Sequence, residues 1–138
     1  MPNIRVATLE DVDFLIDVAL VCYAGEFNED EARVYLTALL QSPGFLVLRG
    51  DAGGLVVQAW ASPWNSQDRR CAVHFIAWAK PAPFELLAAL RMAKDWGAAN
   101  GYPHFYLANY RNKFNLAPLA KYLGMVPAPS SDWESPRS

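Results

Sequence analysis

The stretch from Ala72 to Gly101 constrains the fold of this chain more than any other part of the sequence. It begins with a run of apolar and aromatic residues that is long enough for a strand buried on both faces. After a short turn at Lys80–Pro83, apolar residues recur at helical spacings up to Trp96, and Gly101 follows the pattern. A strand, a short turn and a helix N-terminus form the arrangement by which α/β proteins hold a phosphate group. This turn is therefore the first candidate binding site.

The segments on either side of this stretch complete a single domain. We expect strands at residues 3–7, 45–49, 55–62, 104–109 and 125–128, and helices at residues 8–22, 28–40 and 116–123. Gly25, Gly101 and Gly124 each follow a predicted helix and are expected to end it. The order of the elements predicts an α+β fold with a mixed sheet. We expect one domain over residues 1–128 and a loosely ordered tail over residues 129–138.

The composition argues against several classes of function. The net charge is −2 and the longest basic run is Arg69-Arg70, which argues against a nucleic-acid surface and against an anionic membrane. The apolar runs are too short to cross a bilayer, so a cytoplasmic protein is expected. Cys22 and Cys71 lack the spacing of a metal or redox motif and are expected to be buried thiols, and no metal site is expected.

The order of elements, together with four quoted segments, resembles the GNAT superfamily of N-acetyltransferases. The segments are IRVATLEDVDFLIDVA, FLVLRGDAGGLVVQAWA, LLAALRMAKDWGAANG and LAKYLGM. The resemblance implies a mixed, mainly antiparallel sheet of six or so strands with four flanking helices, and acetyl-CoA as the cofactor of active members. It also implies a notch where the fourth and fifth strands part, which we expect near Ala79 and Ala108. Small proteins of this type are common in bacteria and tailed phages, and some phage versions are virion components.

The turn before the long helix departs from the pattern of the family. GNAT proteins place glycines there, and their backbone N–H groups hold the pyrophosphate of CoA, whereas this chain reads Lys80-Pro81-Ala82-Pro83-Phe84-Glu85. Pro81 and Pro83 have no N–H to donate, and the Glu85 carboxylate repels an anion. Two prolines that start a helix explain this turn better than a ligand does. If the cofactor binds, the resemblance implies that it is held by Lys80 and by the backbone of Ala82, Phe84 and Glu85.

The catalytic groups of the family are also incomplete in this sequence. His74 is expected to share its strand face with Ile76 and Trp78, either as a general base or as a hydrogen-bonded core histidine. The family often places a proton-donating Tyr four residues before the glycine of the last helix, where this chain has Ala120. Tyr110 is the candidate that would replace that tyrosine, and a water molecule is the alternative.

Exposed aromatic residues offer a different type of site. Trp60, Trp64 and Trp133 are candidate anchors for a protein partner or for self-association, because interface hot spots favour Trp. The alternative is that they cap the core. Two functions therefore remain open. The first is a non-catalytic or vestigial GNAT-like binding or accessory component, associated with the virion if it is encoded by a phage. The second is an active acetyl-CoA-dependent N-acetyltransferase that acts on a primary amine.

Overall fold

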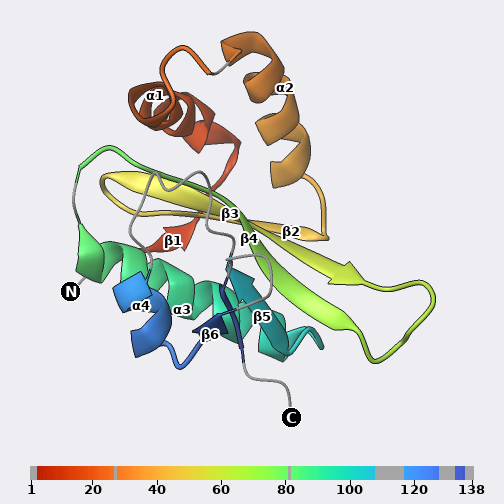
Figure 1. Ribbon diagram of the computed structural model, residues 1–138. Helices are drawn as coiled ribbons and strands as arrows, with labels where there is room; N and C mark the ends of the chain where they lie inside the picture. Colours follow the sequence, from red (N-terminus) through yellow and green to blue (C-terminus); the bar gives the residue numbers. More distant parts are fainter. Residues whose placement is uncertain (1–2, 27, 81, 108–116, 128–132, 136–138) are drawn as a thin grey trace.

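The computed structural model describes residues 3–26, 28–80, 82–107, 117–127 and 133–135 (Figure 1). The elements follow the predicted order of strands and helices. They are β1 (Arg5–Val6), η1 (Leu9–Asp11, a short 3-10 helix), α1 (Val12–Cys22), α2 (Glu29–Leu40), β2 (Phe45–Arg49), β3 (Gly53–Ala61), β4 (Arg69–Trp78), α3 (Pro83–Ala99), β5 (His104–Leu107), α4 (Ala117–Tyr122), β6 (Val126–Pro127) and β7 (Trp133–Glu134). The predicted α+β fold is confirmed.

The described strands form one sheet in the order β1-β2-β3-β4-β5-β7-β6. β4 and β5 pair in parallel, and every other described pair of neighbours is antiparallel, which confirms a mixed and mainly antiparallel sheet. The last strand along the chain, β7, lies between β5 and β6 and belongs to the segment that we expected to be a loose tail. Its pairing with Tyr106 and Leu107 therefore extends the sheet beyond the strands that we predicted.

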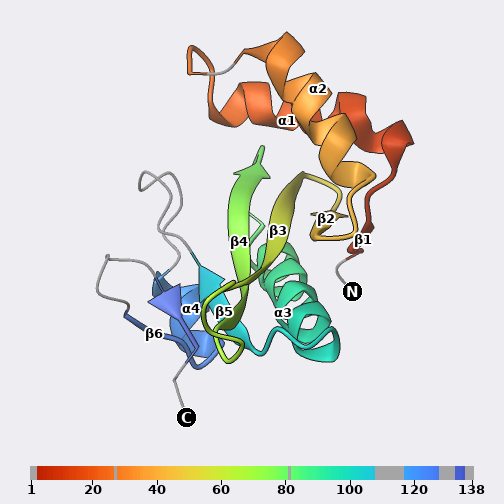
Figure 2. The same cartoon turned by 90° about the vertical axis from the view of Figure 1, so that its right-hand side faces the viewer.

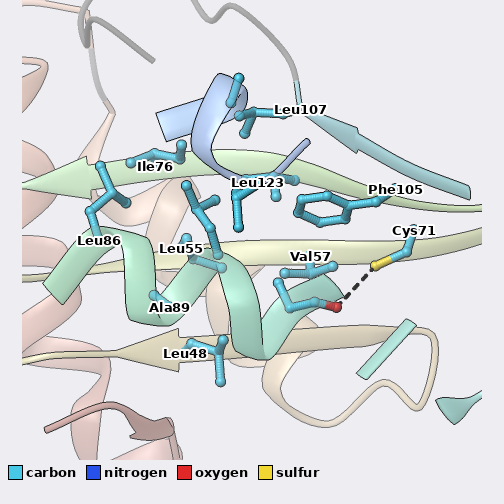
Figure 3. Close-up of a cluster of buried hydrophobic side chains, with 14 of the residues drawn as sticks. Leu48, Leu55, Val57, Cys71, Ile76, Leu86, Ala89, Phe105, Leu107 and Leu123 are labelled. Carbon is cyan, nitrogen blue, oxygen red and sulfur yellow. Dashed lines mark hydrogen bonds between the residues drawn. The ribbon is translucent and has the colours of Figure 1, made fainter. Parts of the chain in front are cut away.

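The helices cover the sheet in two layers. α1 and α2 lie on one face, and α3 and α4 lie on the other (Figures 1 and 2). The larger core cluster is on the α3 and α4 side, where Leu90, Phe105 and Leu107 have almost no exposed surface (Figure 3). Cys71 lies in the same cluster, and burial raises the pKa of its thiol to about 12. Neither cysteine is in a disulfide; Cys71 is buried and Cys22 is half-buried.

Local signals in the sequence set several ends of the helices. The Asn28 side chain accepts a hydrogen bond from the Glu31 backbone N–H at 3.0 Å, as a cap of α2 should. Gly25, Gly101 and Gly124 have φ angles of 83°, 83° and 73°, a conformation that side chains disfavour. Each of them follows a helix, which confirms the predicted ends.

A β-bulge in β4 changes which side chains face each layer. Val56 of β3 pairs with Phe75, but the next residue, Val57, pairs with Val73, so His74 is an extra residue in β4. Val73 and Ile76 consequently belong to the same core cluster on the α3 side, although they are an odd number of residues apart. His74 lies on the other face of the sheet, with α1 and α2. The prediction that His74 shares a face with Ile76 and Trp78 is therefore wrong, because the bulge shifts the alternation.

A buried carboxylate joins β1, β2 and the start of α1. Asp11 is only 4% exposed, and it accepts hydrogen bonds from Arg5 at 2.7 and 2.8 Å, from Arg49 at 3.2 Å and from the Thr8 backbone N–H at 2.8 Å. The Arg49 guanidinium also lies 3.5 Å from the centre of the Phe14 ring. The hydrogen bonds from Arg5 are the main reason why the pKa of Asp11 lies well below its ordinary value.

We expect Asp11→Asn to lower the free energy of unfolding by about 2 kcal/mol at neutral pH, less than for a fully buried pair because Arg5 is half exposed. The pKa of Asp11 is lower in the folded state than its ordinary value of 3.8. Its ionised form therefore stabilises the fold above that value, and the contribution is lost as the pH falls toward the folded pKa.

Urea denaturation of wild type and Asp11→Asn between neutral pH and about pH 2 tests this dependence. The difference in stability should shrink as the pH falls. Asp17→Asn, at an exposed position of α1, is the matched control and should change little. A difference between wild type and Asp11→Asn that stays constant over the whole range would contradict the assignment.

Candidate functional site

The turn between β4 and α3 places the predicted cofactor residues at the start of α3. Pro83 is the first residue of the helix, and Ala82 precedes it without a capping hydrogen bond from its side chain. Lys80 is exposed, and Phe84 has 78% of its surface exposed. Ala82 is half-buried and packs against the core cluster on the α3 side. The proline at the first helical position agrees with the interpretation that this turn starts a helix efficiently.

The Glu85 side chain, in the first turn of α3, binds neighbouring groups of the protein. Its Oε1 accepts hydrogen bonds from the Trp78 indole N–H at 2.9 Å and from the Ala52 backbone N–H at 3.0 Å. Trp78 and Ala52 are both buried, and a Cβ atom at Gly50 would collide with the Glu85 carboxylate. Glu85 therefore connects the start of α3 to the turn between β2 and β3.

The described pairing of β4 with β5 covers the first part of β4. Their described pairs run from Arg70 with His104 to Val73 with Leu107, whereas β4 continues to Trp78. The last described pair lies beside the bulge at His74, and the parting that we expected near Ala79 stays a prediction. Ala108, the residue expected to mark the parting on the other strand, lies outside the described residues.

His74 lies at a cavity of about 220 Å³ between the sheet and the α1–α2 pair. The cavity is lined by Leu15, Ile16, Ala19, Ala32, Tyr35, Leu36, Leu39, Val47, Gly54, Leu55, Val56, His74, Phe75 and Ala77. His74 is exposed, and its Nε2 lies 3.5 Å from the hydroxyl of Tyr35. His74 is consequently not a core histidine. Tyr110, the other catalytic candidate, lies outside the described residues.

A second histidine forms a network that the sequence did not predict. The His104 Nε2 lies 3.2 Å from a Glu134 carboxylate oxygen, and its Nδ1 lies 3.2 Å from the Ser135 hydroxyl. The Ser135 hydroxyl also accepts a hydrogen bond from the Phe105 backbone N–H at 2.9 Å. The network holds β7 against β5. About thirty residues separate its two parts in the sequence, so no local pattern could have indicated it.

Comparison with solved structures decides the fold. A predicted acetyltransferase from Clostridium acetobutylicum, solved with acetyl-CoA, superposes with a TM-score of 0.72 at 14% identity, over 94% of this chain and 92% of that one. A GCN5-related N-acetyltransferase from Ralstonia eutropha gives 0.68 at 16% identity, over 94% and 95%. The PaiA N-acetyltransferase from Thermoplasma acidophilum, in complex with coenzyme A, gives 0.68 at 17% identity, over 97% and 96%. The chain has the GNAT fold.

In sequence comparison, no family model and no curated protein matches the chain. The assignment of the GNAT fold therefore rests on the three-dimensional match and agrees with the order of elements from which the fold was predicted. Within the fold, Lys80, Ala82, Phe84 and Glu85 lie together at the start of α3. His74 faces the opposite side of the sheet, with α1 and α2.

The tryptophans that we considered as partner anchors lie in two different settings. Trp64 is 92% exposed in the loop between β3 and β4, and Trp60 is 40% exposed on β3. The Arg70 guanidinium lies 4.9 Å from the centre of the Trp60 ring. Trp133, in contrast, is half-buried and packs against the core cluster. The GNAT fold thus exposes Trp60 and Trp64 and uses Trp133 in packing.

In the part of the chain that the structure describes, no group of three His, Cys, Asp or Glu side chains is arranged to hold a metal ion. None of the described helices has the length and apolar character needed to cross a membrane.

We expect Glu85→Ala to lower the free energy of unfolding by about 3 kcal/mol, because it leaves two buried N–H donors without an acceptor. Glu85→Gln keeps an acceptor oxygen and should cost about 1 kcal/mol. Glu31 lies in the first turn of α2, so Glu31→Ala is a matched control for the loss of a charge near a helix N-terminus. Equal losses for Glu85→Ala and Glu31→Ala in urea denaturation would show that the hydrogen bonds contribute nothing.

Proposed function

We propose that this chain is a GNAT-fold protein with a degenerate acyl-CoA site that works as a non-catalytic binding or accessory component. The observation that carries the proposal is the start of α3. Pro83 has no N–H at the first helical position, and the Leu86 N–H is bonded to the Ala82 carbonyl at 2.9 Å. Only Phe84 and Glu85 remain as backbone donors within the first helical turn, and the Glu85 carboxylate adds a negative charge there.

The end of the β3–β4 hairpin supports a binding role. Its loop is hydrogen-bonded internally, from the Ser62 N–H to the Asp68 carbonyl at 3.0 Å and from the Asp68 N–H to the Asn65 carbonyl at 3.0 Å. This loop presents Trp64 to solvent, and the strand that leads into it carries Trp60, with the Arg70 guanidinium 4.9 Å from the centre of its ring. Trp and Arg are the residue types that most often dominate binding energy at protein interfaces. We therefore propose that the end of the β3–β4 hairpin binds a protein partner.

The alternative function, acetyl-CoA-dependent N-acetyl transfer to a primary amine, is supported by a different observation. β4 continues past its last described pair with β5, and two of the similar structures were solved with acetyl-CoA or coenzyme A. In that case Lys80 and the backbone of Ala82, Phe84 and Glu85 would hold the pyrophosphate. His74 would take the proton from the amine, on the α1–α2 side of β4.

A thermal-shift titration with acetyl-CoA separates the two functions. A ligand that binds only the native state at about a hundredfold excess over its Kd stabilises that state by about 2.7 kcal/mol, or roughly 5–15 °C for a domain of this size. We expect a shift below about 2 °C at about 1 mM acetyl-CoA, with Lys80→Ala behaving as wild type. A shift of several degrees that Lys80→Ala abolishes would overturn the non-catalytic function and favour the enzyme.

We expect Trp64→Ala to change the free energy of unfolding by less than about 0.5 kcal/mol, because the side chain makes little contact with the fold. Trp60→Ala should cost about 1 kcal/mol, since it removes the ring that lies under the Arg70 guanidinium and the part of its surface that the fold covers. Denaturation in urea measures both variants. If the two losses were the same, Trp64 would have a role in folding and could not be assigned to partner binding alone.

A further inference from the structure

The cavity under α1 and α2 is larger than the packing of a small domain requires. Protein interiors are packed nearly as densely as organic crystals, and few of their voids exceed the size of a water molecule. A volume of about 220 Å³ is well above that size. Apolar cavities of roughly 150 Å³ stay free of water and bind small apolar molecules such as benzene. The cavity therefore has the size and the lining of a site for one small apolar group.

Small side chains from both sides leave this space open. Ala19 of α1 and Ala32 of α2 line the cavity from the helices, and Ala77 of β4 lines it from the sheet. The β-bulge places His74 at the same cavity. Among the described lining residues, only His74 and Tyr35 are exposed, so they mark where the cavity reaches the surface.

The polar groups at this opening indicate what the outer end of a ligand should be. The Tyr35 hydroxyl and the His74 Nε2 are 3.5 Å apart, at the limit of a hydrogen bond, and both can bond to a third group between them. None of the described lining residues is an Asp, Glu, Lys or Arg. A charged ligand group would lose its hydration at this opening without gaining an ionic partner from the lining.

We propose that this cavity binds a small molecule with one aromatic ring or one branched aliphatic group and an uncharged hydrogen-bonding head. The apolar group occupies the cavity, and the head bonds to Tyr35 and His74. The proposal does not rest on the non-catalytic function, because the cavity is on the opposite face of the sheet from α3. It shares His74 with the alternative function, in which that residue would take the proton from the amine, and the comparison of benzyl alcohol with benzylammonium separates the two uses of the site.

Benzyl alcohol is a suitable probe, and its binding can be followed through amide chemical shifts in ¹⁵N-labelled protein. We expect saturable binding in the millimolar range, with shifts confined to α1, α2 and the middle of β4. Ala32→Leu fills the cavity and should weaken binding at least tenfold while raising the melting temperature, which shows that the variant is folded. Ala38→Leu, at an exposed position of the same helix, should bind as wild type does.

The role of the polar head is tested separately. His74→Ala should weaken the binding of benzyl alcohol severalfold and leave the binding of toluene unchanged, because toluene has no head to bond. Benzylammonium should bind more weakly than benzyl alcohol to the wild type. The proposal is overturned if the wild type shows no saturable binding, if Ala32→Leu binds as well as Ala38→Leu, or if benzylammonium binds as tightly as benzyl alcohol.

Discussion

The β-bulge in β4 is the constraint on which the rest of this structure depends. One extra residue at His74 resets the alternation, so that Val73 and Ile76 both face α3 although strict alternation would place them on opposite faces. The described pairing of β4 with β5 also ends at the bulge. The same residue therefore places Ile76 and Trp78 in the larger core and brings an imidazole to the α1–α2 face.

The bulge also determines how α3 begins. It places Trp78 on the α3 side of the sheet, where the indole N–H reaches the Glu85 carboxylate. Gly53 is opposite Trp78, and a Cβ atom there would collide with the Trp78 ring, so the hairpin needs a glycine at that position. The position of the helix start thus follows from the register of the central strands.

The sequence was sufficient for the fold but not for the orientation of the site residues. Hydrophobic periodicity, the Asn28 cap and the three glycines after helices are local signals, and each of them predicted its element correctly. The bulge has no such signal, because residues 72–79 are almost uniformly apolar and either register would bury them. The partners of Glu85 and the bonds between His104 and Ser135 depend on contacts between distant segments, which periodicity does not report.

Stability and anion binding oppose each other at the start of α3. Helix N-termini attract phosphate through free N–H groups and a positive dipole end, and a carboxylate in the first turn satisfies the same dipole internally. Here that carboxylate also accepts two hydrogen bonds from buried donors, so removing it to admit a phosphate would leave Trp78 and Ala52 unsatisfied. A variant of this chain that gained phosphate affinity by losing Glu85 would therefore need a new acceptor for those donors. The cavity on the other face carries no such conflict, because no described charged side chain lines it.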